Sequence, residues 1–215
     1  MVDRTTSRRA STRMTGRERR EQLVAVGRRL FAEKGFDMTT VEEIAARAKV
    51  SKPIVYEHFG GKEGLYAVVV DREVSTLLSD LEDSLSDPRA HPRVLMERAA
   101  LAFLSYIDEN EDGFRILVRD SPVSHAGGTF SSLLTDVARR VEEILAAQLS
   151  LHAYPARDAA LYAQMLVGMV AYTGQWWLES RTPAKEIVAA RMVNLSWHGL
   201  SALEKKPALR GAARR

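Results

Sequence analysis

The segment from Thr39 to Lys62, TTVEEIAARAKVSKPIVYEHFGGK, constrains the fold most strongly, because it predicts two short helices separated by a tight turn. Thr40 and Glu43 have the spacing of a capping box, which begins the first helix. Ser51 is a suitable N-cap for the second helix, and Pro53 falls in its first turn, where no amide donor is needed. Helices this short do not stabilise themselves, so they must pack against other elements.

Both short helices are expected to have one inward and one outward face. The inward residues of the first helix, at helical spacing, are Val41, Ile44, Ala45 and Ala48. In the second helix Val55 and Phe59 point inward, and the outward face consists of Lys52, Ile54, Tyr56, Glu57 and His58. A longer helix precedes the pair, beginning at a second capping box of Thr15 and Glu18 and ending at Gly35. The three helices predict a compact unit that displays a polar helix face.

Extended by FAEKGF upstream and EGLY downstream, this stretch resembles the tetracycline-repressor-type (TetR/AcrR) family of bacterial transcription regulators over about residues 17–70. The resemblance implies an all-α fold, with an N-terminal three-helix helix-turn-helix DNA-binding domain and a larger C-terminal helical domain for effector binding and dimerisation. At the matched positions it implies that the DNA-facing residues are Thr40, Ser51, Lys52, Pro53, Tyr56, His58 and Lys62. Glu57 departs from the pattern, either as a contact to a cytosine amine or as a solvated side chain.

Charge is distributed unevenly along the 215 residues, whose net charge is +3. Residues 1–20 carry seven arginines against two acids, and residues 205–215 carry five basic groups and no acid, which leaves the body acidic. The N-terminal segment fits either an arm that contacts phosphates or a disordered solubilising tail. No apolar run follows the arginines, so we do not expect a signal peptide. The absence of cysteine excludes disulfides and suits a cytoplasmic location.

The rest of the chain also has helical periodicity, and the sequence predicts four segments in all. These are a basic disordered arm at 1–14, the DNA-binding domain at 15–61, an effector-binding and dimerisation domain at 62–204, and a basic disordered tail at 205–215. Helices of the third segment are expected at about 62–85, 92–110, 111–120, 130–152, 156–180 and 183–204, separated by glycine and proline breaks.

Residues 159–178 contain no charge, which is compatible with a membrane span or with a helix buried on nearly every face. Internal glutamines and acids at both flanks favour the buried helix, and a four-helix homodimer interface would bury it. By resemblance the last two helices pair with their symmetry mates. The candidate interface residues are Leu166, Val170, Trp177, Val193, Leu195, Trp197 and Leu200.

The helical body is rich in aromatic and methionine side chains, which suit either an adaptable apolar pocket or ordinary packing. The resemblance implies a small hydrophobic effector. The candidate effector-binding residues are Phe103, Phe114, Phe130, Met165, Met169 and Tyr172. Arg115 and Arg119 could bind an acidic ligand group, but we expect local ion pairs with Glu111 or Asp120 instead.

Enzyme functions find little support. The five histidines lack the spacing of a metal site, and no nucleophile elbow or phosphate-binding loop is present, so we expect no catalytic residue, metal or cofactor. The main hypothesis is a dimeric, ligand-responsive repressor that binds a pseudo-palindromic double-stranded DNA operator. The alternatives are a small-molecule-binding protein whose helix-turn-helix serves protein contacts, and a catalyst with an unrecognised constellation.

Overall fold

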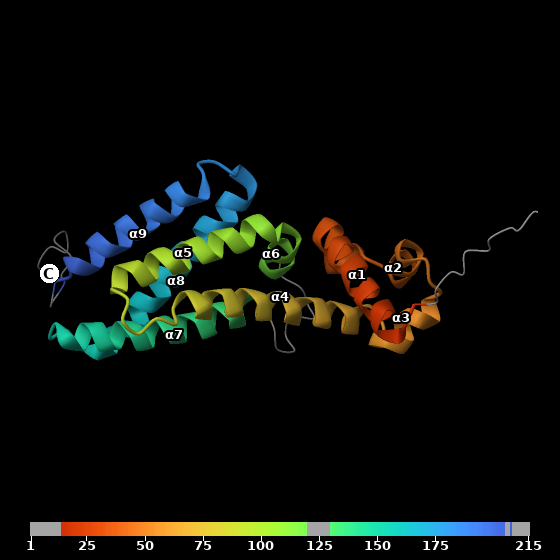
Figure 1. Ribbon diagram of the computed structural model, residues 1–215, viewed down its shortest axis with the longest axis horizontal. Coiled ribbons are helices and arrows are strands. Elements are labelled where there is room, and N and C mark those ends of the chain that lie inside the picture. Colours follow the sequence, from red (N-terminus) through yellow and green to blue (C-terminus); the bar gives the residue numbers. More distant parts are fainter. Residues whose placement is uncertain (1–13, 120–129, 205–206, 208–215) are drawn as a thin grey trace, which may run out of the picture. The chain divides into compact units, whose positions relative to one another are not determined.

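The computed structural model describes residues 14–119, 130–204 and 207, and every regular element in these ranges is helical, which confirms the all-α class (Figure 1). The elements are α1 (Gly16–Met38), α2 (Val41–Ala48), α3 (Lys52–Phe59), α4 (Lys62–Ser84), α5 (Pro92–Glu109), α6 (Glu111–Val118), α7 (Phe130–Leu151), the 3-10 turn η2 (Ala156–Asp158), α8 (Ala159–Ser180) and α9 (Lys185–Ser201). The expected arm at 1–14 and tail at 205–215 lie almost entirely outside the described residues, as does the expected loop at 121–128.

The chain divides into two compact units, Met1–Tyr66 and Ala67–Arg215. The first turn of α4 belongs to the N-terminal unit because its side chains pack on α1. Leu65 is fully buried against Gly27, and the Tyr66 ring meets the rings of Phe31 and Phe36 edge-on, with centroids 5.0 and 4.9 Å away. The division therefore falls one helical turn after the boundary predicted at residue 61.

Helix α1 forms where its sequence predicts. Thr15 accepts the amide hydrogen of Glu18 at 3.2 Å, and Glu18 accepts that of Thr15 at 2.7 Å, so the capping box is complete. Leu23, Leu30 and Phe31 are buried. Regular helix geometry ends at Gly35, whose φ of 80° lies in the region that glycine adopts most readily.

The N-caps of α2 and α3 both differ from the sequence expectation. Thr40 does accept the Glu43 amide at 3.2 Å, but the Glu43 carboxylate binds Lys34 at 2.6 Å, so the capping box predicted for Thr40 and Glu43 is only half formed. Ser51 is at the N-cap of α3 without a side-chain cap bond. The turn itself is closed by Lys49 in the left-handed region and by the Val50 amide, which donates to Ala45 at 2.9 Å.

In the C-terminal unit α5 and α9 lie side by side, while α8 packs on α7 and on α5 (Figure 1). Gly174 of α8 allows the close approach to α5, because an added Cβ would lie 2.3 Å from the Phe103 ring. The charge-free run at 159–178 falls within α8. Among the described residues, no helix is long and apolar enough to cross a membrane.

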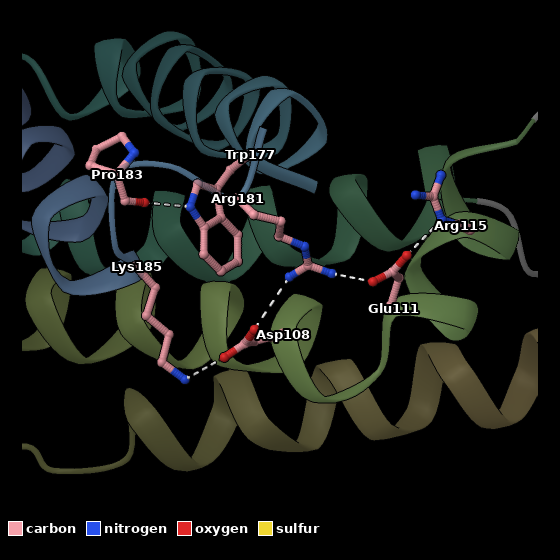
Figure 2. Close-up of polar contacts among 7 residues, drawn as sticks. All are labelled: Asp108, Glu111, Arg115, Trp177, Arg181, Pro183 and Lys185. Carbon is pink, nitrogen blue, oxygen red and sulfur yellow. Dashed lines mark hydrogen bonds and ion pairs between the residues drawn. The ribbon is translucent and has the colours of Figure 1, made fainter. Parts of the chain in front are cut away.

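Polar contacts fix the corner where α5 meets α6 and α8 turns into α9 (Figure 2). Arg181 donates to Glu111 at 2.6 Å and to Asp108 at 3.4 Å, and Lys185 donates to Asp108 at 3.1 Å. The Trp177 indole donates to the Pro183 carbonyl at 2.8 Å. These contacts connect α5 and α6 to the turn between α8 and α9, at least 70 positions further along the chain.

Candidate functional site

The predicted DNA-facing residues lie on α3 and at the helix ends next to it. Thr40, Ser51, Lys52, Pro53 and Tyr56 are exposed, whereas His58 and Lys62 are half-buried. Tyr56 in particular is large, aromatic and 54% exposed, which is the condition a side chain needs to reach an external partner. Val55 is buried, so α3 has the inward and outward faces that its sequence predicts.

The C-terminal end of α3 is held by α1 through Arg20, a contact that the sequence pattern did not indicate. Arg20 donates to the His58 carbonyl at 2.7 Å, and its guanidinium lies 4.4 Å from the centre of the Phe59 ring. Gly64 completes this support, because any Cβ there would lie 1.9 Å from the Phe59 carbonyl oxygen. The short helix is thus fixed at its end by two other helices.

Lys62 has an internal partner in addition to its predicted DNA-facing position. Its ammonium donates to the Phe36 carbonyl at 3.0 Å and lies 4.1 Å from the centre of the Phe36 ring. An ammonium has three donor hydrogens, so this contact leaves capacity for a phosphate oxygen. Lys62 therefore supports the packing of α4 on α1 whether or not DNA is bound.

Ion pairs connect α2 to its neighbours on both sides. Glu43 binds Lys34 of α1 at 2.6 Å, and Glu42 binds Lys52, the first residue of α3. The hydrogen bond from Lys52 holds the pKa of the Glu42 carboxyl below its ordinary value, so Glu42 is ionised at neutral pH.

The C-terminal unit contains a cavity of about 540 Å³ lined by side chains of α4, α5, α7, α8 and α9. It follows α7 from Leu134 to His152, which corresponds to about 27 Å of helix. The α4 contribution includes Leu77 and Leu81, and that of α5 includes Phe103. The cavity is therefore elongated and has the size of a small-molecule site.

Polar groups gather towards one end of this cavity. Gln148, His152, Tyr154 and Ser201 lie near the C-terminal ends of α7 and α9, whereas the region around Leu134 and Phe103 is apolar. The described lining contains no lysine, arginine, aspartate or glutamate. The lining suits a molecule with a long apolar body and a polar group at one end.

Most residues expected in the effector pocket lie outside the cavity, whereas most residues expected at the dimer interface line it. Of the candidate effector residues, only Phe103 lines the cavity among the described side chains; Phe114 packs behind it with ring centroids 5.6 Å apart. Met165 and Tyr172 are exposed and, like Met169, lie outside the lining. The side chain of Phe130, the first residue of α7, lies outside the described part of the chain.

Instead, five candidate interface residues line the cavity, namely Leu166, Val170, Val193, Trp197 and Leu200. Of the other two, Leu195 is exposed, whereas Trp177 is 3% exposed, bonds Pro183 and is covered by the Arg181 guanidinium at 5.0 Å from the ring centre. On α8 the differences from the expectation have one cause. Helix α8 is apolar on nearly every face, so its period separates the faces without showing which of them is internal.

An exposed apolar stripe runs along α8 instead. Its members recur at intervals of three or four residues and, apart from the half-buried Met169, are more than half exposed: Leu161, Met165, Met169, Tyr172 and Trp176. On α9, Ile187 and Leu195 are also exposed. This stripe is therefore a candidate contact surface.

Arg115 forms the local ion pair expected from its spacing, with Glu111 at 3.1 Å, and a second with Glu179 of α8 at 2.7 Å. The bonds to Glu179 and Glu111 raise the pKa of the Arg115 guanidinium. Asp120, the other partner considered, lies outside the described residues. Arg115 thus belongs to the contacts that fix the corner of the helical unit.

A helix-turn-helix supported by a third helix and followed by a second helical unit is the architecture of a DNA-binding regulator. The chain belongs to the TetR family: "Bacterial regulatory proteins, tetR family" matches residues 23–69, and "Tetracyclin repressor-like, C-terminal domain" matches residues 92–199. It is therefore a DNA-binding transcription regulator, as the sequence resemblance implies.

Two curated relatives and one solved structure illustrate the likeness. The transcriptional activator FasR of Mycolicibacterium smegmatis is 30% identical over 202 residues, which cover 90% of this chain and 88% of FasR. The repressor BdcR of Escherichia coli is 36% identical over 89 residues, which cover 40% of this chain and 45% of BdcR. A TetR-like regulator from Rhodococcus sp. RHA1 superposes with a TM-score of 0.72 at 25% identity, covering 89% of this chain and 100% of that one.

Proposed function

We propose that this protein is a cytoplasmic repressor that binds a pseudo-palindromic operator as a homodimer and is released by a small hydrophobic effector. The observation that carries the proposal is the combination of an exposed α3 in the N-terminal unit and an apolar cavity of about 540 Å³ in the C-terminal unit. The exposed α3 suits insertion into a DNA groove, and the apolar cavity suits a small hydrophobic ligand.

In the proposed complex α3 enters the major groove. Lys52 and Lys62 are available for phosphate or base contacts, Tyr56 donates a hydrogen bond, and the α2 and α3 ends at Thr40 and Ser51 approach the backbone. Pro53 is exposed and His58 is half-buried on the same helix. A dimer presents two such helices, so we expect half-sites separated by about one helical turn of DNA, roughly 34–36 Å, or somewhat more.

The homodimer is proposed to form through the exposed stripe on α8 together with α9. A twofold contact brings the same stripe of both copies together, and Tyr172 and Trp176 supply the aromatic area that interface centres favour. This assignment retains the exposed Leu195 but differs for the five expected residues that line the cavity.

The effector is proposed to occupy the cavity and to act through α4. That helix contributes Leu77 and Leu81 to the lining and begins at Lys62 next to the DNA-facing surface. A ligand that fits one position of α4 better than another shifts the equilibrium between two states of the regulator by its differential affinity. We expect the ligand-bound state to have the lower operator affinity.

The proposal is tested by selecting bound sequences from a random duplex library and titrating salt against the recovered operator. Phosphate contacts predict a steep fall of affinity with salt, and Lys62→Ala should make the slope shallower by about 0.9 units. A screen of fatty acyl compounds, other lipids and hydrophobic drugs should then yield a compound that raises the melting temperature and lowers operator affinity.

Three outcomes would contradict separate parts of this function. Failure of the selection to enrich any sequence would exclude operator binding. An operator-linked reporter that requires the protein for expression would identify an activator instead of a repressor. A screen in which no compound changes either melting or DNA affinity would remove the effector.

A further inference from the structure

The ion pair between Glu42 and Lys52 connects the two helices of the helix-turn-helix at the surface proposed to meet DNA. Glu42 is in the first turn of α2, and Lys52 is the first residue of α3. Their side chains are 61% and 53% exposed, so the pair is open to solvent and to an approaching duplex. The matched position of Lys52 places it among the DNA-facing residues.

The other described ion pairs of α2 connect it to α1 and involve no DNA-facing residue. Glu43 binds Lys34, and Arg47 binds Glu33 at 3.5 Å, and both partners belong to α1. Among the described ion pairs of the N-terminal unit, the Glu42 pair alone occupies a lysine at a DNA-facing position. An exposed pair adds little to folding stability, so its main consequence concerns binding.

Two electrostatic effects follow when DNA approaches. The Glu42 carboxylate competes with phosphate and base oxygens for the Lys52 ammonium, and it also repels phosphates. A lysine that remains on a carboxylate releases no counterion from the duplex and therefore adds nothing to salt-dependent affinity. At an operator with a guanine at the right position, the major groove offers the ammonium two further acceptors, O6 and N7, beside the phosphates that every duplex supplies.

We propose that Glu42 determines sequence specificity by holding Lys52 until a duplex offers its ammonium base acceptors in addition to phosphates. On random DNA Lys52 stays with Glu42, and at the operator it transfers to the DNA. Glu42 thus weakens binding to wrong sequences more than binding to the operator, which increases the ratio of the two affinities. This inference rests on the proposed DNA-binding function.

The test compares E42Q with E43Q, which removes the same charge one residue away but releases Lys34 of α1 in place of Lys52. Operator and random duplexes are titrated with full-length protein at several salt concentrations. For E42Q we expect random-duplex affinity to rise about three- to fivefold, the most that an exposed pair is worth, with operator affinity changed less than about twofold. The salt slope on random duplex should steepen by about 0.9. E43Q should change both duplexes equally.

A K52A background provides the second comparison, because there E42Q should behave like E43Q. Melting curves of each variant verify that the unit is folded. Equal effects of E42Q and E43Q in the wild-type background, or equal effects of E42Q on both duplexes, overturn the specificity role while leaving DNA binding intact. Absence of duplex binding by the wild-type protein overturns the proposed function, and this inference with it.

Discussion

Tyr106 of α5 donates its hydroxyl hydrogen to the Glu73 carboxyl of α4 across 2.9 Å, and both side chains are buried in the C-terminal unit. The bond lies one helical turn from the cavity on each helix, because Leu77 follows Glu73 by four residues and Phe103 precedes Tyr106 by three. It therefore fixes the position of α4 next to the proposed effector site.

Removing this hydroxyl should destabilise the C-terminal unit. We expect Tyr106→Phe to lower the free energy of unfolding by about 1–3 kcal/mol, the range for a buried hydrogen bond to a carboxyl group. Denaturant unfolding followed by circular dichroism measures the change. Tyr162→Phe removes a hydroxyl from half-buried Tyr162 of α8 and should cost much less. Equal costs for the two variants would show that the Glu73 bond contributes nothing specific.

Filling the cavity should block the effector response without affecting DNA binding. Val170 lines the cavity, whereas its neighbour Met169 does not. Val170→Phe is expected to abolish the ligand-induced rise in melting temperature, since the added ring occupies ligand volume, and to leave operator affinity unchanged. Met169→Phe should retain the response. Thermal shift and fluorescence anisotropy measure the two quantities, and loss of response in both variants would place the ligand elsewhere.

Charging the exposed stripe of α8 should produce folded monomers. Tyr172 and Leu151 are both 76% exposed, but only Tyr172 belongs to the stripe. Tyr172→Glu should dissociate the dimer, because a buried unpaired charge at a dry contact is poorly tolerated, whereas Leu151→Glu should not. Sedimentation velocity at micromolar concentration distinguishes them. A monomeric wild-type protein would refute the proposed interface. Trp177→Glu is expected to unfold the protomer instead, because Trp177 is internal.

The Glu111 contacts predict a stability difference that depends on pH. Hydrogen bonds from Arg115 and Arg181 hold the pKa of the Glu111 carboxyl below its ordinary value of 4.5. A depressed folded-state pKa contributes stability above pH 4.5 that is lost as the pH falls through the folded value. Glu111→Gln should therefore lower the melting temperature at pH 7, by about 1–3 °C because the group is half exposed.

At pH 3 the melting temperatures of the wild-type protein and Glu111→Gln should lie closer together than at pH 7, since the stability contributed by a lowered carboxyl pKa declines below pH 4.5. Differential scanning calorimetry at both pH values measures the difference. Glu142→Gln on α7 removes an exposed acid of equal charge and should change melting little at either pH. A Glu111→Gln deficit that persists undiminished at pH 3 would indicate a packing effect instead of ionisation.

Local chemistry explains why much of the N-terminal unit could be predicted. The Thr15 capping box, the buried Val55 and the break at Gly35 depend on residues within one or two turns, and all three occur in the structure. The contact of Arg20 with His58 could not be predicted in this way, because 38 residues separate the two and neither has a local signature. The bond of Glu43 to Lys34, in place of the predicted capping bond, could not be predicted either, because it joins two different helices.

The sequence by itself determined the helices, their approximate ends and the family, because capping residues, glycines, prolines and helical period act within a few residues of one another. Only the tertiary structure decided the faces of α8. Val170 lines the cavity and Tyr172, two positions later, is exposed, although both lie in one charge-free run. Where every face of a helix is apolar, burial depends on where the neighbouring helices α5 and α7 pack, and the sequence of α8 does not contain that information.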